Sequence, residues 1–123
     1  MTIEETIDLL SGAAAFDRRT VGEADAIAWH AILGDLRFED CRAALLAHYG
    51  ESTDWVMPAH IRNRVKEIRR IRLEDAEIPA PPPELIEDPE RYRAWLRAAV
   101  RRIADGEDPA AVTAKPLRSL GPA

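Results

Sequence analysis

Side chains able to perform chemistry are few and widely spaced in this chain of 123 residues. The three histidines, His30, His48 and His60, are 18 and 12 residues apart, whereas two metal ligands on one helix face need a spacing of three or four. None of the six glycines precedes a lysine, so the chain has no Gly-Lys-Ser/Thr phosphate-binding loop. No motif places a base beside a serine or beside the single cysteine, Cys41. We therefore predict no catalytic, metal-binding or cofactor-binding residue, and a protein that is not an enzyme.

A group of basic side chains that could bind a polyanion lies on a predicted helix at residues 58–75, which begins with a proline. At 100° per residue, apolar side chains fall on one face of this helix and basic side chains on the other. The basic face consists of Arg62, Lys66, Arg69 and Arg70. It could contact the phosphates of nucleic acid. Alternatively it is a solvated face, or one neutralised by acidic residues in the first half of the chain or at residues 84–90.

A group of aromatic, aliphatic and arginine side chains lies on a predicted helix at residues 89–105. Asp88 is the expected N-cap, Pro89 the first helical residue and Gly106 the stop. Aromatic and arginine side chains dominate the binding energy of many protein interfaces. The residues predicted to bind a partner are Tyr92, Trp95, Leu96, Val100, Ile103, Arg93 and Arg97. The alternative is that the apolar stripe folds back and completes a core.

The basic and aromatic groups are expected to lie on helices. Apolar residues recur at spacings of three and four, and no segment shows the sustained alternation of a strand. Helices are expected at residues 2–14, 21–33, 38–49, 58–75 and 89–105. The predicted fold class is therefore all-α, with a compact bundle of about four helices, a proline-rich spacer and a fifth, amphipathic C-terminal helix.

Several side chains have a predicted place in these helices. Ile3, Ile7, Leu10 and Ala14 are expected on the apolar face of the first helix. The second helix is expected to be the most buried, with Thr20 as N-cap and Gly34 as a left-handed stop. In the third helix, Cys41 and His48 are expected on the inner face and Gly50 at the end. Trp55, Val56 and Met57 are expected to form an apolar anchor before the fourth helix.

Four prolines between residues 79 and 83 mark the clearest boundary in the chain, because they forbid a helix and favour an extended spacer. The predicted organisation has four parts. They are a helical bundle domain at 1–75, an acidic proline-rich linker at 76–88, an amphipathic basic helix at 89–105 and a flexible tail at 106–123.

The formal net charge of −5 is unevenly distributed. Residues 1–50 hold four basic and nine acidic side chains, residues 76–90 hold five carboxylates and no basic residue, and residues 91–104 hold five arginines and no carboxylate. Such segregation favours contacts within the chain or with a partner. The mean hydropathy is −0.29, no apolar run approaches the roughly 20 residues of a membrane span, and the first residues are acidic, unlike a signal peptide. We therefore expect a cytoplasmic protein that does not bind membranes.

Three segments carry a resemblance to a known family: AWHAILGDL at residues 28–36, FEDCRAALLAHY at 38–49 and MPAHIR at 57–62. With them, residues 1–73 resemble the phage replicative-helicase loader/inhibitor family, a group of small helical phage replication proteins. The resemblance implies a helical N-terminal domain, a C-terminal part that engages the hexameric helicase, and no ATPase activity. It also implies residence in the cytoplasm of a bacterial host.

These observations predict a non-enzymatic adaptor in phage or prophage DNA replication, which binds a replicative DNA helicase as loader or inhibitor. The bundle would contact another replisome protein, or bind DNA weakly or indirectly through the helix at 58–75. One alternative is a small helical DNA-binding regulator that uses the basic face of that helix. A homodimer that exchanges the helix at 89–105 is a further alternative. No cofactor is expected.

Overall fold

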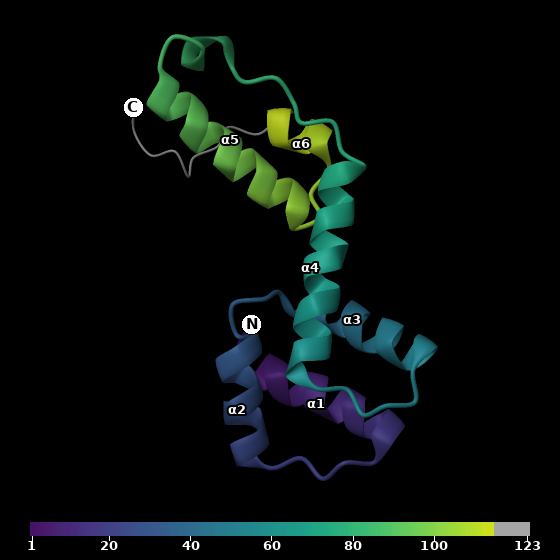
Figure 1. The fold of residues 1–123 in the computed structure, drawn as a ribbon. Helices are drawn as coiled ribbons and strands as arrows, with labels where there is room; N and C mark the ends of the chain where they lie inside the picture. Colours follow the sequence, from purple (N-terminus) through teal and green to yellow (C-terminus); the bar gives the residue numbers. More distant parts are fainter. Residues whose placement is uncertain (115–123) are drawn as a thin grey trace. The chain divides into compact units, whose positions relative to one another are not determined.

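The computed structural model describes residues 1–114, and every regular element in that range is helical (Figure 1). The elements are α1 (Ile3–Asp17), α2 (Glu23–Leu33), α3 (Phe38–Glu51), α4 (Pro58–Glu74), the 3-10 turn η1 (Pro83–Leu85), α5 (Pro89–Ala104) and α6 (Pro109–Ala114). The predicted all-α class is therefore confirmed. None of these helices is both long enough and apolar enough to cross a membrane.

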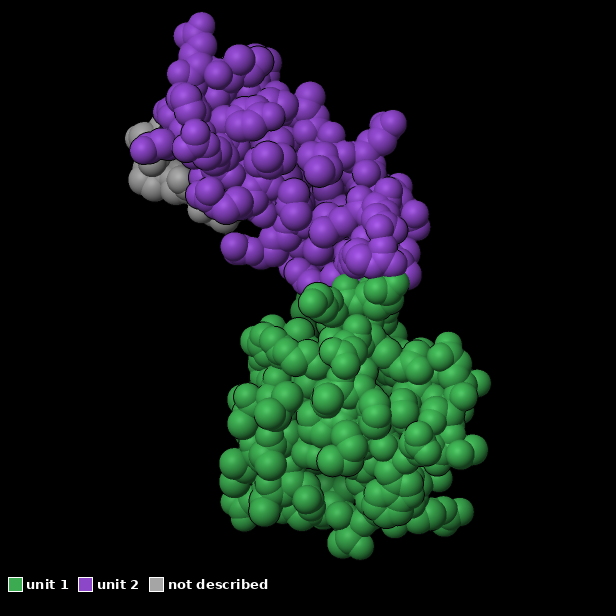
Figure 2. Space-filling model, in the orientation of Figure 1, with its two compact units in different colours: residues 1–68 green, residues 69–123 purple. Residues whose placement is uncertain are grey.

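The chain divides into two compact units, unit 1 at residues 1–68 and unit 2 at residues 69–123 (Figure 2). The division falls within α4, whereas the sequence placed a boundary further along, at the start of the proline-rich segment. Each unit has its own cluster of buried apolar side chains. Each is therefore described by itself.

In unit 1, α1 packs against both α2 and α3. Thr2 caps α1, because its hydroxyl accepts a hydrogen bond from the Glu5 N–H and the Glu5 carboxylate accepts one from the Thr2 N–H. The buried face of α1 consists of Thr6, Leu9, Leu10 and Ala13. Ile3 and Ile7 are 37% and 42% exposed, so their expected place on the core face is wrong. The prediction is correct for Leu10, and Leu9 lies beside it in the core.

The second helix differs most from its prediction. It begins at Glu23, after Gly22, whose N–H donates to the Asp25 carboxylate at 2.8 Å. Thr20 is exposed and lies outside the helix, so the predicted cap is wrong. The core contacts of α2 are confined to Ala26, Trp29 and Leu33. Its predicted broad buried face is largely solvent-exposed, including Ile27 at 56% and Ile32 at 49%.

Gly34 follows α2 with an ordinary right-handed conformation, φ −61°, and not the left-handed one that was expected. A glycine is required there for a different reason. A Cβ atom on Gly34 would lie 2.7 Å from the backbone oxygen of His30, closer than the two atoms can approach. The tight turn from α2 toward α3 therefore depends on the absence of a side chain.

The third and fourth helices lie close to their predicted positions. Cys41 and His48 are buried on the inner face of α3, as expected. The helix continues through Gly50, the expected stop, and ends at Glu51. In α4, Ile61 and Val65 are buried in the core of unit 1.

Unit 2 closes around α5. Its core joins Leu85 of η1 and Val112 of α6 to three residues of α5, namely Trp95, Ala99 and Ile103. Asp88 caps α5 as predicted, because its side chain accepts a hydrogen bond from the Arg91 N–H at 3.2 Å. Gly106, at φ +102°, follows the helix in a conformation that side chains disfavour.

Two of the predicted parts contain structure of their own in unit 2. Within the predicted linker at 76–88, η1 places Leu85 in the core, where it is 2% exposed. Within the predicted tail at 106–123, α6 buries Val112 at 1% exposed. The remainder of that predicted tail, residues 115–123, lies outside the described residues.

Candidate protein-interaction surfaces

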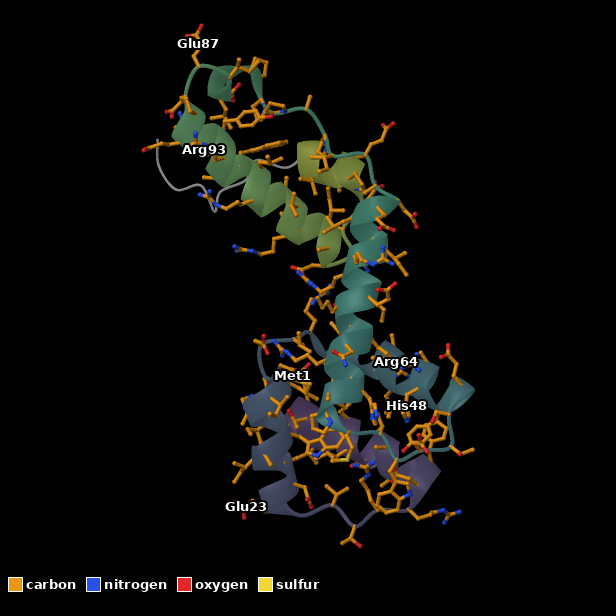
Figure 3. All side chains as sticks on the ribbon, in the orientation of Figure 1. Met1, Glu23, His48, Arg64, Glu87 and Arg93 are labelled. Carbon is orange, nitrogen blue, oxygen red and sulfur yellow. The ribbon has the colours of Figure 1, made fainter. Side chains whose placement is uncertain are left out.

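The connection between α3 and α4, residues 52–57, is held by hydrogen bonds from side chains of other segments. His48, labelled in Figure 3, donates from Nε2 to the backbone oxygen of Asp54 at 2.7 Å. The Tyr49 hydroxyl accepts from the Val56 N–H at 2.9 Å, and Arg19 Nη2 donates to the Val56 oxygen at 2.7 Å. Val56 itself is fully buried. The connection is therefore fixed on both sides of Trp55.

Arg19 supports this connection as part of an ion pair inside unit 1. Its Nε lies 3.0 Å from both carboxylate oxygens of Asp17, and its Nη2 lies 2.6 Å from one of them. The Arg19 and Asp17 side chains are only 10% and 2% exposed. Because Arg19, helped by the Tyr49 hydroxyl, stabilises the charged form more than burial disfavours it, the pKa of Asp17 falls from 3.8 to about 2. The pair is charged at neutral pH.

The same guanidinium also contacts two tryptophans. Its central carbon lies 5.1 Å from the ring centroid of Trp29 and 5.3 Å from that of Trp55, within the range of cation–π attraction. Trp29 is 7% exposed and belongs to the core, whereas Trp55 is 54% exposed. Arg19 therefore joins an exposed indole to the interior of unit 1.

Two further apolar side chains are exposed around this network. Phe16, 52% exposed, stacks on Tyr49 with ring centroids 4.8 Å apart, and Met57, 51% exposed, directly follows the anchored Val56. We name Phe16, Trp55 and Met57 the Trp55 surface. The prediction that Trp55, Val56 and Met57 together form an apolar anchor is correct for Val56 and wrong for the other two. The hydrogen bonds to residues 54 and 56 turn the intervening side chain outward.

The histidines come together in a way that their spacing did not suggest. The rings of His48 and His60 stack with centroids 4.8 Å apart. One nitrogen of each is already bonded to backbone, since His60 Nδ1 accepts from the Met57 N–H at 2.9 Å. Within residues 1–114, no group of three or more histidine, cysteine or acidic side chains could hold a metal ion. The stack therefore helps to shape the connection before α4.

Cys41 has the environment of a structural residue. It is fully buried, and burial raises the pKa of its thiol from 9.0 to about 11. A thiol is a nucleophile only as the thiolate, which is scarce at neutral pH under these conditions. The residue therefore packs as a small apolar side chain.

The basic residues predicted on α4 are largely paired with carboxylates. In unit 1, Arg62 bonds both oxygens of Asp35 at 2.8 Å and also donates to the Ile32 oxygen. Lys66 is exposed and makes no ion pair with residues 1–114. In unit 2, ion pairs join Arg69 to Asp105 and Arg70 to Glu74. Three of the four predicted phosphate contacts are thus neutralised by neighbouring carboxylates.

The residues of α5 that were predicted to bind a partner differ in how far they are buried. Trp95 and Ile103 are 3% and 2% exposed and fill the core of unit 2. Tyr92, Leu96 and Val100 are half-buried. Arg93 and Arg97 are exposed. The accessible part of this predicted surface is therefore its arginine side, bordered by half-buried residues.

Sequence reasoning did not find the Trp55 surface, because the residues that hold Trp55 in place come from separate segments. Asp17 is the last residue of α1 and Arg19 follows that helix, Tyr49 lies in the last turn of α3, and Trp55 lies in the connection. No spacing rule joins such positions. The signal present in the sequence was local: a tryptophan and a methionine directly flank a valine between two polar or proline positions.

Comparison with known proteins gives no relative. No protein-family model matches the chain, and neither a curated protein nor a solved structure matches it.

Proposed function

We propose that this protein is a non-enzymatic adaptor that binds one protein partner through each of its two units. An adaptor needs two binding surfaces, each on a support that keeps its own shape. Units 1 and 2 have separate cores. Unit 1 exposes the Trp55 surface, and unit 2 exposes the arginine side of α5.

The observation that carries this proposal is the fixed exposure of Trp55. Burying a tryptophan is favourable, yet the bonds from His48, Tyr49 and Arg19 hold the connection so that Trp55 stays 54% exposed. A side chain fixed in its binding conformation loses little entropy when a partner covers it. Tryptophan is also enriched among the residues that dominate interface energies. The arrangement is that of a preformed anchor for a protein partner.

The resemblance of residues 1–73 to phage helicase loaders and inhibitors supports a replicative DNA helicase as the partner of unit 2. In this proposal the exposed Arg93 and Arg97, with half-buried Tyr92, Leu96 and Val100, contact the helicase. The Trp55 surface contacts another replisome protein. The association either loads the helicase or inhibits it.

The DNA-binding alternative has less support. Arg62, Arg69 and Arg70 pair with carboxylates, and the chain carries a net charge of −5. DNA affinity measured against salt concentration distinguishes the two functions, since each phosphate contact steepens the salt dependence. An adaptor should bind duplex DNA weakly at physiological salt. A steep dependence that weakens when Lys66 and Arg62 are changed to glutamine would support the regulator instead.

The adaptor is tested by co-purification of the full chain with a replicative helicase and other replisome proteins. Trp55→Ala should abolish the contact made by unit 1. Ile27→Ala is the matched control, because Ile27 has a similar exposure, 56%, on a different helix. If no replisome protein is retained, or if the two variants behave alike, the proposed function is wrong. Mass measured over a concentration series separately tests the homodimer.

A further inference from the structure

Three arginines on α5 form a row that has no charged partner in the described structure. Arg93, Arg97 and Arg101 are four residues apart in succession, and all three are exposed. None makes an ion pair with residues 1–114. Their neighbour Arg102, by contrast, pairs with Glu107. We name these three residues the arginine row.

The row lies on the outer side of unit 2. Trp95, Ala99 and Ile103 turn the opposite side of α5 into the core. Arg93 extends from the outer side of the helix (Figure 3). A rise of about 1.5 Å per residue separates successive row positions by about 6 Å along the helix axis, and the whole row by about 12 Å.

The contacts among the three row arginines do not stabilise the helix that carries them. Like charges four residues apart on a helix repel one another and destabilise it by roughly 0.2–0.5 kcal/mol per pair. Arg93 with Arg97, and Arg97 with Arg101, are two such pairs. In α4 the corresponding spacing is filled by an attractive pair, Arg70 with Glu74. A binding function explains the row better than a folding function does.

Apolar side chains border the row on one side. Leu96 and Val100 each lie three residues beyond a row arginine, and both are half-buried. A surface with a line of cations beside a line of aliphatic groups matches a helix that carries acidic residues beside an apolar stripe. Carboxylates four residues apart on such a helix repeat at the same spacing of about 6 Å.

We propose that the arginine row binds an acidic, amphipathic α-helix of a partner protein, with carboxylates at positions i, i+4 and i+8 opposite the three arginines. This inference rests on the proposed adaptor function, and it gives the chemistry of the partner of unit 2. Each guanidinium can hold a carboxylate with two parallel hydrogen bonds.

A nucleic acid fits the same surface less well. The segment that leads into α5 carries Glu84, Glu87, Asp88 and Glu90, and all of these except Asp88 are exposed. A polyanion longer than the row would meet these carboxylates. A helix of about three turns contacts the three arginines and the adjoining aliphatic side chains without extending over the acidic segment.

The direct test uses two alanine-based helical peptides of identical composition and the full-length protein. One peptide carries glutamates at i, i+4 and i+8 beside a leucine stripe, and the other distributes the same glutamates around the helix. The aligned peptide should bind at least about fivefold more tightly, with an affinity that falls as salt is added. Equal binding of the two peptides, or tighter binding of a short DNA duplex, would overturn the proposal.

Arg97→Glu is the critical variant, because it reverses the central charge of the row while replacing both repulsive pairs by attractive ones. R97E should bind the aligned peptide about tenfold or more weakly, because one attractive contact is lost and the new carboxylate repels the peptide's glutamates. Arg42→Glu, at an exposed position of α3, makes the same charge change in unit 1 and should leave binding unaltered. Retained binding by R97E, or equal loss in R42E, would contradict a site on α5.

The outcome also separates this inference from the adaptor function. If replisome partners are retained by R97E but lost by W55A, the adaptor stands and the arginine row is not its second site. If the aligned peptide binds but no replisome protein is retained by the native chain, the row recognises acidic helices and the proposed function fails.

Discussion

Trp55 and Trp95 are of the same residue type but lie in opposite environments. Trp95, on α5 of unit 2, is 3% exposed, whereas Trp55, between α3 and α4 of unit 1, is 54% exposed. Trp95 lies in an apolar stripe repeated at helical spacing, and η1 and α6 cover that stripe. Trp55 lies in an irregular segment whose neighbours are tied down by hydrogen bonds. An apolar stripe at helical spacing is buried when other elements pack against it. A loop whose backbone is fixed by hydrogen bonds can leave an aromatic side chain exposed to solvent.

The largest expected difference between the two tryptophans is in stability. Trp95→Ala removes the largest side chain from the core of unit 2 and should destabilise that unit by about 3–5 kcal/mol. Urea unfolding followed through the amide signals of α5 measures this effect. Trp95→Phe keeps most of the volume and serves as control. A loss below about 1 kcal/mol for W95A would mean that the core of unit 2 does not depend on this residue.

The second effect concerns the ion pair beneath Trp55. Asp17 has a pKa of about 2 in the fold, against 3.8 for the free side chain, so its ionisation stabilises unit 1 above about pH 4. This contribution is lost as the pH falls from about 4 to 2. Asp17→Asn should therefore lower the unfolding free energy of unit 1 by about 2 kcal/mol at neutral pH.

Comparing native and D17N protein by urea unfolding at pH 7 and at pH 2 checks the sign. The difference between them should shrink on acidification, because the native carboxyl then becomes neutral as well. Asp8→Asn, at an exposed position of α1, is the control. A difference that stays constant over this pH range would show that Asp17 acts through packing and not through its charge.

The periodic parts of the fold could be predicted from the sequence, and the tertiary exceptions could not. Pro58 and Pro89 open α4 and α5, and Asp88 and Gly106 bound α5, because each acts within one turn of the chain. Which face of α1 is buried, and whether Ile27 of α2 is exposed, depend on how many other helices pack around each helix. Local spacing carries no information about that number.

The same distinction explains the candidate surfaces. Arg93 and Arg97 were identified as site residues from helical spacing, and the structure leaves both exposed. Arg19 was not identified, since its importance comes from contacts with Trp29 and Trp55, which lie in other segments, as well as from its pair with Asp17. For the basic residues of α4, the sequence showed the cations but could not show which carboxylates would pair with them.

Trp55→Ala should alter stability far less than Trp95→Ala. Its loss removes one cation–π contact with Arg19 and the covered half of the indole surface, at a cost of about 1–2 kcal/mol. Thermal unfolding of the variant measures this cost, with Ile27→Ala as the control of similar exposure. A loss as large as that of W95A would mean that Trp55 supports the fold, which would remove the argument that it is kept exposed for binding.

The smallest expected effect is a gain in stability. Arg97→Glu places a carboxylate between Arg93 and Arg101 and turns two repulsive i, i+4 pairs into attractive ones. Because two repulsions are removed and two attractions are added, unit 2 should become more stable by about 1 kcal/mol. Urea unfolding at low salt should show the gain, and added salt should reduce it. Arg97→Gln, which removes the repulsion without adding attraction, should fall between the native protein and R97E. If R97E were instead destabilised, Arg97 would have a supporting contact within the fold, and the arginine row could no longer be regarded as held open for a partner. If R97E is more stable but no longer binds the aligned peptide, the arginine row lowers the stability of α5 and serves binding. Trp95, on the same helix, has the opposite role, because it stabilises unit 2.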